Sequence, residues 1–119
     1  MIAKPWSFDD PQFITIRDRK YGVHEAIRCA RDLPVKDLRL DELYISYCNP
    51  AHDTLRDFVA HIKSVLEADL DHPILLNEDG ACIDGRHRIC KALLEGKETI
   101  KAKRFETDPG SCYTTTTTP

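Results

Sequence analysis

The segment from residue 73 to residue 96 constrains the fold of this chain more than any other. It contains a short apolar run over 74–76, an Asn-Glu-Asp-Gly turn, and a second short run over 81–83. Two such runs around a glycine-containing turn are typical of a β-hairpin. Residues 86–95 then show helical apolar spacing and are followed by Gly96, a common helix end.

This helix should face the core with Ile89 and with either Ala92 or Leu93, because these positions recur at helical spacing. A hairpin followed by a helix in so short a stretch indicates a mixed α/β fold. With 119 residues, the chain suits one small domain.

Three basic residues, Arg86, His87 and Arg88, open the predicted helix directly after Asp84 and Gly85. A helix start exposes unpaired N–H groups and carries a partial positive charge, so cations there are not favoured by the helix itself. Glycine lets a ligand approach the backbone, and phosphate is a common anion at such a place. The plainer interpretation is that the cations sit in water and that Asp84 only caps the helix.

Apolar periodicity predicts further elements on both sides of this segment. In chain order they are a strand over 13–16, a short helix over 23–32, an extended segment over 35–40, a strand or loop over 43–47, a helix over 54–66 and a last strand over 99–105.

The helix over 54–66 has the clearest pattern. Thr54 and Asp57 resemble a capping box at its start. Its apolar residues share one face, and they are Leu55, Phe58, Val59, Ile62, Val65 and Leu66. After Phe105 no apolar periodicity is left, so residues 106–119 are expected to pack little.

Composition narrows the classes of function. The net charge is −3, which argues mildly against nonspecific nucleic-acid binding. No apolar run approaches the roughly 20 residues that span a bilayer, and the first residues lack the apolar core of a signal peptide. The five cysteines are odd in number and no pair has Cys-x-x-Cys spacing, which favours reduced thiols in a cytoplasmic protein. No four-ligand zinc pattern is visible, so no metal site is predicted from spacing.

The segment from Pro73 to Phe105 resembles the signature region of the ParB/sulfiredoxin superfamily. The matching residues are Pro73-Ile74-Leu75-Leu76, Asp79-Gly80, Ile83-Asp84-Gly85-Arg86-His87-Arg88, Ala92, Gly96 and Ile100. The resemblance implies one α/β (α+β) domain over 35–105, with a small mixed sheet and packed helices. Residues 1–34 would then be an N-terminal elaboration, and 106–119 a flexible tail.

The same resemblance implies a ligand. Superfamily members bind nucleotide phosphates at this turn, which here would mean ATP, ADP or CTP, with magnesium as a candidate companion. The binding residues would be Gly85, Arg86, His87 and Arg88. Whether phosphoryl transfer or nucleotide hydrolysis follows is left open.

Kinase-like relatives that phosphorylate free serine carry an Asp-Gly-His-His-Arg turn, which differs from this chain at Arg86. Asp84 and His87 would be the catalytic candidates in such a site. These relatives also use a distant glutamate, for which Glu42 is the candidate here, although a solvated surface acid is the simpler interpretation of Glu42. Sulfiredoxin places its catalytic cysteine at the position of Arg86, so that chemistry is not implied.

Two other classes of function remain open. Superfamily members act in plasmid and chromosome partition, and some are called ParB-like nucleases, which makes a DNA-associated module one alternative. The chain is acidic, however, and shows no helix-turn-helix or dimerisation domain. The other alternative is an inhibitor or accessory protein of phage or plasmid type that binds a host protein.

Overall fold

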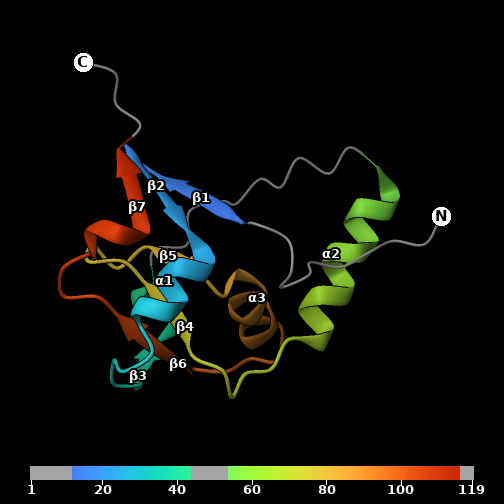
Figure 1. Cartoon of the computed structure of the whole chain (residues 1–119). Coiled ribbons are helices and arrows are strands. Elements are labelled where there is room, and N and C mark those ends of the chain that lie inside the picture. Colours follow the sequence, from blue (N-terminus) through green and yellow to red (C-terminus); the bar gives the residue numbers. More distant parts are fainter. Residues whose placement is uncertain (1–11, 44–53, 116–119) are drawn as a thin grey trace.

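The computed structural model describes residues 12–43 and 54–115, and its larger sheet is mixed and has four strands (Figure 1). Its strands lie in the order β3-β6-β4-β5. They are β3 (Lys36–Arg39), β6 (Thr99–Arg104), β4 (Ile74–Leu76) and β5 (Cys82–Asp84). β6 pairs antiparallel with β3 and parallel with β4, and β4 pairs antiparallel with β5. The expected hairpin and the strand expected over 99–105 are therefore confirmed, although this strand is not the last one in the chain.

The two faces of this sheet support separate core clusters, because successive side chains of a strand point to opposite faces. Ile74 and Leu76 of β4 pack in one cluster with Ile89 and Ala92 of helix α3 (Arg86–Leu94). Leu75 packs on the other face, where helix α1 (Val23–Cys29) contributes to the second cluster.

Helix α3 has the predicted place and orientation. It covers 86–94, with Ile89 and Ala92 buried and Leu93 51% exposed. Ala92, rather than Leu93, is thus the second core residue. Helix α1 and strand β3 likewise confirm the elements expected over 23–32 and 35–40, while nearly all of the segment over 43–47 lies outside the described residues.

A second sheet holds three antiparallel strands in the order β1-β2-β7. They are β1 (Phe13–Ile16), which was expected, and β2 (Arg19–Gly22) and β7 (Tyr113–Thr115), which were not. Tyr21 of β2 and Val23 of α1 belong to the core cluster that includes Leu75. Residues 13–29 therefore pack with the rest of the described chain. That residues 1–34 are an N-terminal elaboration of a domain over 35–105 stays a prediction.

The expectation that residues 106–119 pack little is wrong for 106–115. Asp108 is 5% exposed and Cys112 is 2% exposed, and β7 pairs with β2. A short 3-10 helix, η2 (Gly110–Cys112), leads into β7. The segment is held by the buried side chains of Asp108 and Cys112 and by backbone pairing between β7 and β2. It has no apolar repeat, so apolar periodicity did not predict its packing.

Helix α2 (Leu55–Glu67) begins as predicted, since the Thr54 hydroxyl accepts a hydrogen bond from the Asp57 N–H at 3.1 Å. It lies at the side of the molecule, with α3 between it and the strands (Figure 1). The described part of the chain is thus a small mixed α/β structure of three α-helices and two sheets. No helix in that part is long and apolar enough to cross a membrane.

Candidate functional site

The turn between β5 and α3 depends on the absence of a side chain at Gly85. Its φ angle is +117°, and a Cβ atom there would lie 2.5 Å from Cγ2 of Ile74. Both the backbone conformation and the close approach of Ile74 therefore require glycine. The space beside the Gly85 Cα is therefore occupied by Ile74 of the core.

Arg88 connects the first turn of α3 with the end of β5 and with the residues just before β4. Its Nη2 donates to Asp84 Oδ2 at 2.7 Å, and its Nη1 donates to the carbonyl oxygens of Pro73 at 2.6 Å and His72 at 3.2 Å. The Arg88 and Asp84 side chains are only 16% and 21% exposed. The interpretation of Asp84 as a helix cap is wrong, because Gly85 occupies the N-cap position and no side chain caps the helix.

Arg86 has a different environment. It is half-buried, and within the described segments its side chain forms no hydrogen bond or ion pair. The first turn of α3 contains no acidic residue, so its first N–H groups have neither a capping side chain nor a neighbouring carboxylate on the helix. The start of α3 therefore combines an uncompensated guanidinium with unpaired backbone donors.

His87 contacts a residue that the sequence did not indicate. Its Nε2 lies 3.1 Å from Nδ1 of His61 on α2, and the two rings meet edge to face. Burial lowers the pKa of His87, and the nearby charges of His61 and Arg88 act in the same direction, while Asp84 opposes them. The neutral imidazole is therefore favoured near pH 7, and one of its nitrogens is engaged by His61.

Glu42 is not close to this turn. It is exposed and ends the 3-10 helix η1 (Leu40–Glu42), which follows β3. β3 and β5 are the opposite edge strands of the four-stranded sheet, with β6 and β4 between them. The structure thus brings Asp84, Gly85 and the three basic residues together and leaves Glu42 apart.

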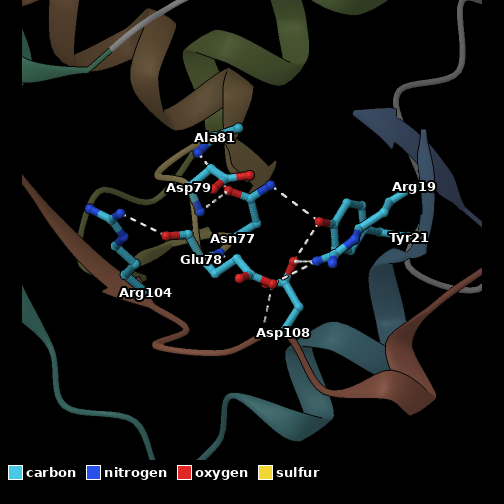
Figure 2. A network of polar contacts seen from close by, with 8 residues as sticks. All are labelled: Arg19, Tyr21, Asn77, Glu78, Asp79, Ala81, Arg104 and Asp108. Carbon is cyan, nitrogen blue, oxygen red and sulfur yellow. Dashed lines mark hydrogen bonds and ion pairs between the residues drawn. The ribbon is translucent and has the colours of Figure 1, made fainter. Parts of the chain in front are cut away.

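A partly buried polar network is centred on the turn of the β4–β5 hairpin, at residues 77–81 (Figure 2). The Tyr21 hydroxyl donates to Asp108 Oδ2 at 2.6 Å and accepts from Asn77 Nδ2 at 3.2 Å. Arg19 Nη1 donates to Asp108 Oδ2 at 2.8 Å and to Glu78 Oε1 at 2.6 Å. The Asp108 side chain is fully buried, so these partners compensate a charge that has lost its water.

The same network fixes the hairpin turn. Asn77 Oδ1 accepts the N–H groups of Asp79 and Ala81 at 2.9 and 2.8 Å, and Asp108 Oδ1 accepts that of Glu78 at 2.9 Å. Burial and the hydrogen bond to Asp108 raise the pKa of Tyr21, so its hydroxyl keeps its proton. These contacts join β2, the hairpin and the C-terminal segment, and their role is structural.

Comparison with known proteins found no matching family model, no similar curated protein and no similar solved structure. Among residues 12–43 and 54–115, no group of three or more His, Cys, Asp or Glu side chains is placed to hold a metal ion.

Proposed function

We propose that this chain binds a phosphate group, as part of a nucleotide, at the start of α3. The observation that carries the proposal is the uncapped first turn of α3 with the unpaired guanidinium of Arg86 beside it. Backbone N–H groups and an arginine fork together match the geometry of a phosphate.

The contacts divide the roles among the turn residues. Arg86 would bind the anion directly, together with the N–H groups of the first turn. Arg88 already binds Asp84 and two carbonyl oxygens, so it would hold the turn in shape instead of contacting the ligand. His87, neutral near pH 7, would donate a hydrogen bond from Nδ1 to the phosphate in the tautomer whose Nε2 accepts from His61.

The order of elements supports a ParB/sulfiredoxin-like fold as part of this proposal. Strand β4, hairpin strand β5, the Asp-Gly turn, α3 and β6 follow one another as the resemblance implies. ATP, ADP and CTP are the proposed ligands, with magnesium bound through the phosphates. Whether the site also transfers or hydrolyses a phosphate stays open, and Glu42 is not part of the proposed site.

A thermal-shift panel tests the proposal, because a ligand that binds only the folded state raises its melting temperature. ATP, ADP, CTP and GTP are compared with inorganic phosphate, each with and without magnesium. At least one nucleotide should raise the melting temperature of the wild type more than that of Arg86→Ala. Arg31→Ala is the matched control, since Arg31 is an exposed arginine next to α1 and distant in sequence from the turn. A panel with no shift at millimolar ligand would remove the proposal.

The other two functions stay predictions. A DNA-associated module would show binding that falls steeply with added salt. A host-protein inhibitor would bind its target whether or not Arg86 is replaced.

A further inference from the structure

Two cysteines lie where helix α1 meets the C-terminal segment. Cys29 ends α1, and Cys112 ends the 3-10 helix η2, which lies beside α1 (Figure 1). Cys112 is 2% exposed in the core cluster that includes Leu75, and the half-buried Cys29 packs against the same cluster. The fold therefore brings together two free thiols that are far apart in the sequence.

The contact between α1 and η2 is close at the sulfur of Cys29. Its Sγ lies 3.6 Å from the Oγ of Ser111, the residue directly before Cys112. Glu25, one turn earlier on α1, and Cys29 both act electrostatically on the Cys112 thiol, so this side of α1 faces η2. Because consecutive Cα atoms are only about 3.8 Å apart, Cys112 lies within a short movement of the Cys29 sulfur.

The other two described cysteines lie on the opposite face of the four-stranded sheet. Cys82 packs against the core cluster that includes Ile74, and Cys90 is on α3, whose buried residues belong to that cluster. The sheet separates this cluster from the one that holds Cys112. Among the four described cysteines, Cys29 is thus the one that can reach Cys112 without crossing the sheet.

We propose that Cys29 and Cys112 form a reversible disulfide when the protein is exposed to hydrogen peroxide. The peroxide transfers one oxygen to the Cys29 sulfur, which becomes a sulfenic acid, and water leaves. The Cys112 sulfur then attacks the Cys29 sulfur. The S–S bond forms as the S–O bond breaks, and the hydroxyl leaves with the Cys112 proton as a second water. Two thiols and one peroxide thus give one disulfide and two waters.

Exposure and acidity assign the two roles. Burial raises the pKa of Cys112 to about 11, and the nearby charges of Cys29 and Asp108 act in the same direction. The thiolate is the form that reacts with an oxidant, so the buried and protonated Cys112 does not react first. Cys29 is half-buried, which leaves its sulfur accessible to a small peroxide.

The disulfide would connect the C-terminal segment covalently with α1. This segment is otherwise held by the hydrogen bonds of Asp108 and by the pairing of β7 with β2. A bond between Cys29 and Cys112 closes a long loop, and closing a long loop restricts the unfolded chain. Oxidation should therefore raise the melting temperature by several degrees, and dithiothreitol should reverse the change.

Peptide mapping of the full chain tests the bond. The wild type is treated with hydrogen peroxide, unfolded, alkylated with iodoacetamide and digested. A peptide linked through Cys29 and Cys112 is expected, and dithiothreitol should remove it. Cys29→Ser should leave Cys112 reduced after the same treatment. Cys90→Ser is the matched control, since Cys90 is also half-buried, and it should form the link like the wild type.

Cys112→Ser tests the order of the two steps. In this variant the sulfenic acid at Cys29 has no Cys112 thiol to attack it, so dimedone, which traps sulfenic acids, should label Cys29 several-fold more than in the wild type. Equal labelling of the two proteins would overturn the role of Cys112. If Cys112→Ser does not fold, the comparison between Cys29→Ser and Cys90→Ser still decides whether the bond forms.

The linked protein should migrate as a monomer in a non-reducing gel, because the bond lies within one chain. An oxidised wild type without the linked peptide, or with Cys29 linked to a different cysteine, overturns the inference. The same holds if Cys112 is oxidised equally in Cys29→Ser. An unchanged melting temperature of the linked form would overturn the stabilising role of the bond.

Discussion

Gly85 determines both the backbone conformation and the packing of the turn before α3. It combines a φ of +117° with a Cα that packs against Ile74, whose Cγ2 would be 2.5 Å from an added Cβ. A substitution there must strain the backbone and displace a fully buried isoleucine at the same time.

Gly85→Ala should therefore lower the free energy of unfolding by about 2–4 kcal/mol. Urea denaturation measures this loss. Gly110→Ala is the control, because Gly110 has open space around its Cα and no positive φ, and it should change stability by well under 1 kcal/mol. Equal effects of the two substitutions would contradict the packing described for Gly85.

Tyr21 connects three segments through one hydroxyl group. Replacing it with phenylalanine leaves one Asp108 oxygen without this donor and the Asn77 amide without an acceptor, in a place where Tyr21 is 1% exposed. Tyr21→Phe should cost about 1–3 kcal/mol in the free energy of unfolding, because buried polar groups lose their partners. Tyr113→Phe, on the neighbouring strand β7, should cost less, and chemical denaturation of both variants would show the order.

At the scale of elements, α2 and α3 are joined by a pair of imidazoles. The pKa of His87 is lowered in the folded protein from its ordinary value of 6.5. Below pH 6.5 the unfolded chain therefore binds this proton more readily than the folded protein does. The contribution of neutral His87 to the free energy of unfolding is complete above pH 6.5. It is lost as the pH falls toward the pKa of His87 in the folded protein.

Replacing His87 with phenylalanine should flatten the dependence of stability on pH just below 6.5. His72→Phe is the control, because the His72 side chain is 74% exposed, and it should keep the wild-type slope. Urea midpoints between pH 7.5 and 5.5 provide the comparison. An unchanged slope in His87→Phe would show that another group carries the dependence.

Elements with local signals could be predicted from the sequence. The hairpin, the Asp-Gly turn and α3 each have their own turn residues, glycines and apolar spacing within 73–96. Helix α2 was equally visible through Thr54 and its apolar stripe, but the direction in which that stripe points was not, because it depends on what packs beside the helix. The β-branched threonines of Tyr113–Thr115 were a weak strand signal, although only pairing with β2 makes them a strand.

At the scale of the whole molecule, contacts between distant segments account for what the sequence did not reveal. Asp108 and Tyr21 are 87 residues apart, and His61 and His87 are 26 apart, so no local pattern connects either pair. Glu42 shows the converse, since the resemblance placed it near the turn and the sheet order puts it at the opposite edge. Of the candidate site, the cluster from Asp84 to Arg88 was predictable, but the division between structural Arg88 and unpaired Arg86 was not.

Phosphate binding at the start of α3 is tested most directly by isothermal titration of the wild type, Arg86→Ala and Arg31→Ala with ATP, ADP and CTP in the presence of magnesium. A charge-assisted contact contributes roughly 1.5–3 kcal/mol, so Arg86→Ala should weaken nucleotide binding by about one to two powers of ten. Arg31→Ala should bind like the wild type. Wild-type protein that binds none of these nucleotides at millimolar concentration, or Arg86→Ala that binds as tightly as the wild type, would contradict the proposed site.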